Sequence, residues 1–184
     1  MSMIRSLLLL GMLLPGASGI AAQEVCKRNL EPQGGFSLCV PDGWTVSEKE
    51  GEKYKLFFAP AAERFTANIN MKDGVSAMAL GDYATAGVDH ILKNYTQFGA
   101  TSVKALTRDS FTAKTGLAGI KATFRVEYKG LLIRTIQYYF SGNAEQKLIL
   151  TCTLLEADQA TLDPVCDRAA KTFQLEAKTP PKEE

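Results

Sequence analysis

Residues 118–155, AGIKATFRVEYKGLLIRTIQYYFSGNAEQKLILTCTLL, contain the clearest structural pattern in the chain. Apolar and polar side chains alternate from Ile120 to Tyr128, the pattern of a strand with one buried face. Turn-forming residues follow at 129–130 and again at 141–143. Each turn contains a glycine, which can adopt a positive φ. The stretch therefore predicts three consecutive antiparallel strands.

The second and third of these strands, Leu131 to Phe140 and Lys147 to Leu155, are apolar on both faces or nearly so. A sheet of that composition is usually covered on both sides. We therefore expect helices, not water, on its two faces.

Two segments have helical character. Leu80 to Phe98 carries apolar residues at helical spacing, and Gly99 follows as a stop. A second helix is predicted to begin near Thr161 as its N-cap, with Pro164 in the first turn, where a missing N–H costs little. The stripes expected to face the sheet are Leu80, Ala84, Val88, Ile91, Leu92, Tyr95 and Phe98 in the first helix, and Leu162, Val165, Ala169 and Phe173 in the second.

Shorter elements lie outside the central stretch. Residues 23–35 are predicted to be an extended lead-in, and Lys49 to Lys53 a charged, solvated loop. Trp44 follows a Pro-Asp-Gly turn; we interpret it as a lid on the core, and the alternative is an exposed binding anchor. The remaining strands are predicted at Phe36 to Val40, Tyr54 to Ala59, Phe65 to Met71 and Ser102 to Ser110.

The N-terminal residues have the pattern of a secretory signal. Arg5 precedes a short apolar run, Leu7 to Leu14, which Pro15-Gly16 and small residues follow. We expect residues 1–22 to be a signal peptide, 23–176 a single domain and 177–184 a disordered tail. The product would be periplasmic or secreted, with no transmembrane helix in the mature chain, because the apolar run is too short to span a bilayer.

The charge balance and the cysteines narrow the class further. Lys and Arg number 21 against 20 Asp and Glu, which argues against a nucleic-acid partner. Four cysteines in an exported chain predict disulfides, for which three pairings are possible. Proximity in the sequence favours Cys26 with Cys39 and Cys152 with Cys166. The alternative for Cys152 is a small, apolar core residue.

Three short segments resemble a known family. Residues 36–44, FSLCVPDGW, resemble the opening strand and Pro-x-Gly-Trp turn of PsbP-like and DcrB-like proteins. Residues 80–84, LGDYA, and 170–173, AKTF, resemble the start of that family's first helix and the end of its last. The resemblance implies an α+β fold, an α/β/α sandwich whose central antiparallel sheet is covered by two helices. Members share a scaffold and not an activity, so the likeness speaks for fold.

No catalytic motif is present. The chain lacks a Walker loop, HExxH, GxGxxG and GxSxG. His90 is the only histidine; a metal site with Asp82 or Asp89 is the less favoured interpretation, because the three residues do not share one helix face. The chain also has no CxxC motif, which would suggest a metal site. We therefore predict no catalytic residue, no cofactor and no metal ligand.

The function predicted from the sequence is an exported, non-enzymatic binding or accessory module of the cell envelope, with an envelope protein as its partner. The alternative is a carrier of a small molecule or metal, which would use a pocket between the first helix and the sheet. A hydrolase with a spatially assembled site is the third hypothesis.

Overall fold

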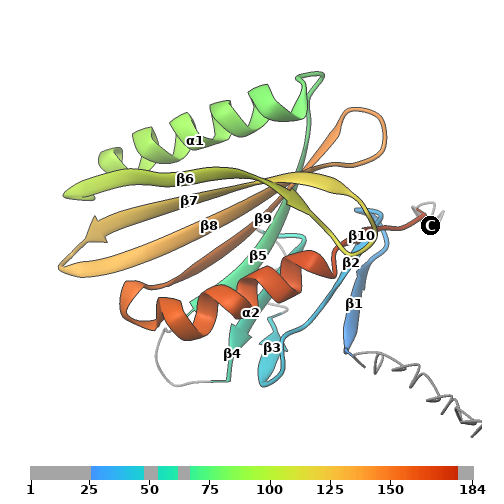
Figure 1. Cartoon of the computed structure of the whole chain (residues 1–184), viewed down its shortest axis with the longest axis horizontal. Helices are drawn as coiled ribbons and strands as arrows, with labels where there is room; N and C mark the ends of the chain where they lie inside the picture. The colour runs from blue at the N-terminus through green and yellow to red at the C-terminus, as the bar shows by residue number, and fades with distance from the viewer. Residues whose placement is uncertain (1–25, 48–53, 62–66, 178–184) are drawn as a thin grey trace, which may run out of the picture.

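The computed structural model describes residues 26–47, 54–61 and 67–177 (Figure 1). The predicted signal peptide, the charged loop at 49–53, Phe65 and all but the first residue of the predicted tail lie outside the described residues.

A seven-stranded antiparallel sheet forms the body of the described chain, in the order β3-β4-β5-β9-β8-β7-β6. Three of its consecutive strands, β7, β8 and β9, form the predicted meander, which is confirmed. Lys129 and Gly130, both with positive φ, make the two-residue turn between β7 and β8. The strands are β3 (Trp44–Val46), β4 (Leu56–Pro60), β5 (Ala67–Val75), β6 (Ser102–Thr112), β7 (Ala118–Tyr128), β8 (Leu131–Ser141) and β9 (Gln146–Leu155).

A second, three-stranded sheet was not predicted. It consists of β1 (Arg28–Glu31), β2 (Phe36–Cys39) and β10 (Gln174–Leu175), with β2 in the middle. Residues 28–31 of the predicted extended lead-in are therefore a strand, β1, whose pairing with β2 was not predicted. The two-residue β10 has no periodicity of its own and forms only because it pairs with β2.

The layers are those of the predicted sandwich. Figure 1 shows α1 (Leu80–Gln97) and α2 (Gln159–Lys171) on opposite sides of the large sheet. The α2 side holds the larger core, in which the ring of Phe173 stacks on that of Phe140 at 4.5 Å. The α1 side holds a smaller one, formed by Ala84, Ala122, Phe124 and Tyr139.

The start of α2 differs from the prediction. The chain passes from β9 through a 3₁₀ turn, Glu156–Asp158, directly into the helix, so Thr161 lies inside α2 and is not its N-cap. Pro164 likewise lies beyond the first turn. Because proline has no N–H, α2 lacks one intrahelical hydrogen bond there. The buried helical residues are Cys166, Ala169 and Ala170, while Leu162 and Val165 of the predicted stripe are half-buried.

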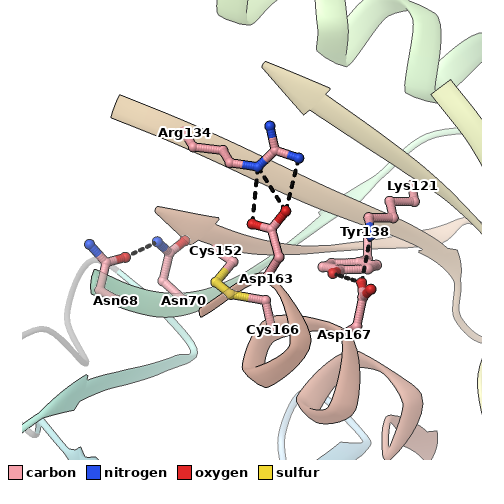
Figure 2. Close-up of a disulfide and its surroundings, with 9 residues drawn as sticks. All are labelled: Asn68, Asn70, Lys121, Arg134, Tyr138, Cys152, Asp163, Cys166 and Asp167. Carbon is pink, nitrogen blue, oxygen red and sulfur yellow. Dashed lines mark hydrogen bonds and ion pairs between the residues drawn. A yellow bond between two sulfur atoms is a disulfide. The ribbon is translucent and has the colours of Figure 1, made fainter. Parts of the chain in front are cut away.

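Several contacts hold α2 against the sheet (Figure 2). The disulfide between Cys152 and Cys166 joins β9 to the helix. Arg134 of β8 donates from Nε to both carboxylate oxygens of Asp163, at 3.0 and 2.9 Å. Further along α2, the Asp167 carboxylate accepts from Lys121 at 2.7 Å and also from the Tyr138 hydroxyl. Burial and that carboxylate raise the pKa of Tyr138.

The other disulfide joins Cys26 to Cys39, next to β1 and β2. Both pairs are those that proximity in the sequence favours. Trp44 is half-buried and packs against the larger core, in agreement with its interpretation as a lid.

Candidate functional site

The α1 helix covers only part of its face of the sheet. It contacts β6, β7 and β8, and Ala84 is its one fully buried residue. Phe98, predicted to end the buried stripe, is 75% exposed. Beside the helix lies a groove of about 860 Å³, which we call the α1 groove.

The floor of the α1 groove is polar. It is formed by side chains of β5, β9 and β8, which lie opposite one another in the sheet. Asn70 and Gln137 flank Thr151, and Thr135 pairs with Thr153. The prediction that the central strands are apolar on nearly both faces is therefore wrong for this face. The polar floor residues are Asn70, Thr135, Gln137, Thr151 and Thr153, and among the described residues Ile149 of β9 is the one apolar side chain that these strands contribute to the lining.

A chain of hydrogen bonds orients part of this floor. The buried Tyr139 hydroxyl donates to the side-chain oxygen of Gln137, whose amide nitrogen donates to Thr151 Oγ1 at 3.2 Å. Burial, and to a lesser degree the neighbouring Tyr83, raise the pKa of Tyr139, so the hydroxyl stays protonated at neutral pH. Both ends of the Gln137 amide are thus engaged within the protein.

Gly87 permits this arrangement. A Cβ built at residue 87 would lie 2.7 Å from the Tyr139 hydroxyl, so only glycine lets α1 pass this close to the ring. The ring of Tyr83 meets that of Tyr139 edge-on, and Arg108 of β6 donates to the Gly81 carbonyl and the Thr85 hydroxyl, each at 2.6 Å. The N-terminal half of α1 is therefore anchored to the sheet through Tyr139 of β8 and Arg108 of β6.

Thr135 stands out among the floor residues. Its side chain is 1% exposed, and its hydroxyl oxygen has no hydrogen-bond partner among the described residues. A buried hydroxyl without a partner costs about 1–3 kcal/mol. A buried, unpartnered hydroxyl of this kind needs an explanation, and the residue belongs to the lining of the α1 groove.

The wall and mouth of the α1 groove carry the aromatic residues and the charges. The α1 side chains His90, Ile91, Tyr95 and Phe98 line one side. On the other, Lys72 lies over the ring of Tyr54 at 5.0 Å and is exposed. Among the described residues, the lining of the groove includes no carboxylate.

The structure places the residues weighed for metal binding as follows. His90 is exposed and shares a 2.7 Å hydrogen bond with Asn94, one helical turn on. Asp82 and Asp89 are not part of the groove lining. Within the described ranges, no group of three or more potential ligands could hold a metal ion.

Sequence reasoning missed the floor residues. The signal was present, because threonines, an asparagine and a glutamine recur at every second position of otherwise apolar strands.

For the described part of the chain, neither helix is long and apolar enough to cross a membrane.

Comparison with known proteins bears on the fold. No protein-family model and no curated protein sequence matches the chain. Among solved structures, it is similar to the cyanobacterial PsbP protein CyanoP from Synechocystis sp. PCC 6803, with a TM-score of 0.65 and 19% identity over 90% of this chain and 98% of that one.

Two further structures show the same architecture. LpqN of Mycobacterium tuberculosis, a protein involved in cell envelope biogenesis, matches with a TM-score of 0.57 and 14% identity over 84% of this chain and 87% of that one. The Ran-binding protein Mog1p of Saccharomyces cerevisiae matches with a TM-score of 0.57 and 14% identity over 83% and 96%. The chain therefore has the PsbP-like α+β fold, while the DcrB-like half of the resemblance stays a prediction.

Proposed function

We propose that the protein is an extracytoplasmic, non-enzymatic binding protein whose binding site is the α1 groove. The observation that carries this proposal is the unpartnered, buried hydroxyl of Thr135 on the polar floor. The groove volume of about 860 Å³ lies within the usual range for small-molecule sites, roughly 300–1,000 Å³. This is the carrier hypothesis, now attached to particular residues.

The disulfides support an extracytoplasmic location. Two disulfides within one small domain are typical of proteins in oxidising compartments. Together with the signal peptide predicted at residues 1–22, they favour a periplasmic or secreted protein.

The chemistry of the groove supports binding without catalysis. General acid–base catalysis needs a group that exchanges protons near the working pH. Burial raises the pKa of Tyr83 and of Tyr139, which moves both hydroxyls further from that role. His90, in the wall of the groove, is hydrogen-bonded to Asn94. Two structural neighbours are described by binding or envelope roles, an analogy at the level of fold only.

A thermal-shift screen tests the proposal. A ligand that binds only the native state raises the melting temperature by mass action, so we expect at least one member of a panel of neutral, anionic and cationic metabolites and metals to do so. Thr153→Trp, which fills the groove, should abolish the shift, and Lys171→Trp, an exposed site on α2, should preserve it. A panel without any shift, or a shift insensitive to the groove-filling variant, would count against the α1 groove as the site.

A second candidate is an accessory module that binds an envelope protein. Phe98, Leu131 and Leu132 are 75%, 50% and 48% exposed. They lie at the same end of the molecule, where α1 ends and the β7–β8 turn is located (Figure 1). Clustered apolar side chains on a surface often mark protein contacts. In vivo cross-linking of the tagged protein should recover one dominant partner, which Leu131→Asp should release; recovery that ignores this substitution would contradict it.

A further inference from the structure

The hydrogen-bond donors and acceptors that remain free on the floor of the α1 groove limit the class of ligand that fits it. Asn70 donates from Nδ2 to the side chain of Asn68 at 3.1 Å, which leaves its own side-chain oxygen able to accept. Thr151 accepts from Gln137, so its hydroxyl hydrogen remains able to donate. Thr135 can both donate and accept. The floor thus offers the Asn70 oxygen as an acceptor and three threonine hydroxyls, those of Thr135, Thr151 and Thr153, within neighbouring strands.

The partner that fits such a floor is a group that donates and accepts at once. A carboxylate or phosphate only accepts, so it would leave the Asn70 oxygen without a donor; an ammonium only donates. A hydroxyl group satisfies an acceptor and a donor side by side. Several hydroxyls on one ligand would match the row formed by Asn70, Thr151 and Thr135.

The charges in the groove agree with an uncharged ligand. Its buried floor side chains, Asn70, Thr135 and Gln137, are all neutral. An ionised group placed there would lose its hydration without gaining an opposite charge. Among the described lining residues, the one Lys or Arg is Lys72, which is exposed and lies over the Tyr54 ring.

The wall supplies the complementary apolar contact. Tyr83, Tyr95 and Phe98 line the same groove from α1 and its C-terminal end. Aromatic rings offer a broad apolar face, and tyrosine adds a polar tip. The C–H face of a sugar ring packs on such a surface while its hydroxyls point to the polar side.

We propose that the α1 groove binds an uncharged, polyhydroxylated ligand, the chemistry of a neutral carbohydrate, with ligand hydroxyls bonded to Thr135 and Thr151. This inference rests on the proposed function, because it assumes that the α1 groove is a binding site. It adds the class of ligand and the two hydroxyls that select it.

The test is calorimetric titration and thermal shift with matched probes. The neutral set is glucose, cellobiose and maltotriose; the charged set is glucuronate, glucose 6-phosphate and glucosamine, which match glucose in size, and cellobionate, which matches cellobiose; N-acetylglycinamide represents amide ligands. We expect binding by at least one neutral saccharide and none by the charged counterpart of comparable size.

Two variants locate the contact. Thr135→Val keeps the side-chain shape and removes the hydroxyl, so saccharide affinity should fall by about tenfold, the equivalent of one hydrogen bond. Without ligand, this variant should melt at the same temperature or higher, because the deleted hydroxyl has no partner in the protein. The control, Thr123→Val, removes a similarly buried hydroxyl on the α2 side of the sheet, away from the groove, and should leave saccharide affinity unchanged. Thr151→Val provides a second variant of the contact if Thr135→Val fails to fold.

The outcomes separate the two proposals. Binding of charged or amide probes alone, abolished by Thr153→Trp, would overturn the carbohydrate inference and leave the binding function in place. Saccharide affinity unchanged in folded Thr135→Val and Thr151→Val would also overturn it. Absence of binding by every probe class would overturn both.

Discussion

The disulfide between Cys152 and Cys166 should contribute more to the free energy of unfolding than the disulfide between Cys26 and Cys39. The two bonds span 14 and 13 positions, so loop closure gives nearly the same term for each, about 3 kcal/mol. Burial distinguishes them. Cys152 and Cys166 are both 0% exposed within the larger core, whereas Cys26 is only half-buried.

The expected magnitudes follow from that difference. The double variant Cys152→Ala/Cys166→Ala removes two buried sulfur atoms from a packed core, each comparable to a methylene group worth about 1 kcal/mol. Added to the loop term, the loss is roughly 5 kcal/mol. Cys26→Ala/Cys39→Ala deletes one fully buried sulfur and should lose roughly 4 kcal/mol.

Equilibrium unfolding in urea, followed by Trp44 fluorescence and circular dichroism, measures both losses. The slope of each transition should be compared as well, because a chain without a crosslink exposes more surface on unfolding. Equal losses, or a larger loss for the Cys26–Cys39 pair, would refute the argument from burial. A second readout is alkylation in reductant without denaturant: Cys26 and Cys39 should react first, and simultaneous modification of all four cysteines would contradict the argument.

Two other predictions concern the pKa of Glu176 and the contact of Gly87 with Tyr139. The Ser37 hydroxyl, then the Gln174 amide, hold the pKa of Glu176 below its usual value. Because the pKa is lower in the folded state, ionised Glu176 stabilises the folded protein at pH values above the unfolded-state pKa, and this stabilisation is lost as the pH falls through the folded-state pKa. Ser37→Ala should raise the pKa of Glu176 in an NMR titration, and an unchanged value would contradict the assignment. Gly87→Ala should lower stability by about 1 kcal/mol in urea unfolding, because crowding against Tyr139, about 1–3 kcal/mol, outweighs the gain of up to about 1 kcal/mol in helix propensity; a more stable variant would show that the ring has room to move.

Local patterns were enough for the main elements. Period-two alternation predicted β7, and helical spacing predicted α1 to within one residue of its end. These patterns work because each residue's face depends on its neighbours along the chain. The boundaries of α2 were missed because the 3₁₀ turn before it is set by the path from β9, not by a capping residue.

Pairing between distant segments was not accessible in this way. The small sheet brings Ser37 opposite Gln174, and nothing near either residue specifies the other. Similarly, α1 was predicted with a stripe that ends in Phe98, but the extent of sheet beneath the helix decides whether that side chain is covered.

The candidate site shows the same division. That Thr135, Gln137 and Thr151 are polar residues within strands follows from local sequence, because residue identity and alternation are local properties. Their position side by side depends on the strand register, and their position beside a groove depends on where α1 packs. The physical reason is that register and helix placement arise from packing between segments far apart in the chain, and a hydroxyl without a partner becomes visible only after all other partners have been placed.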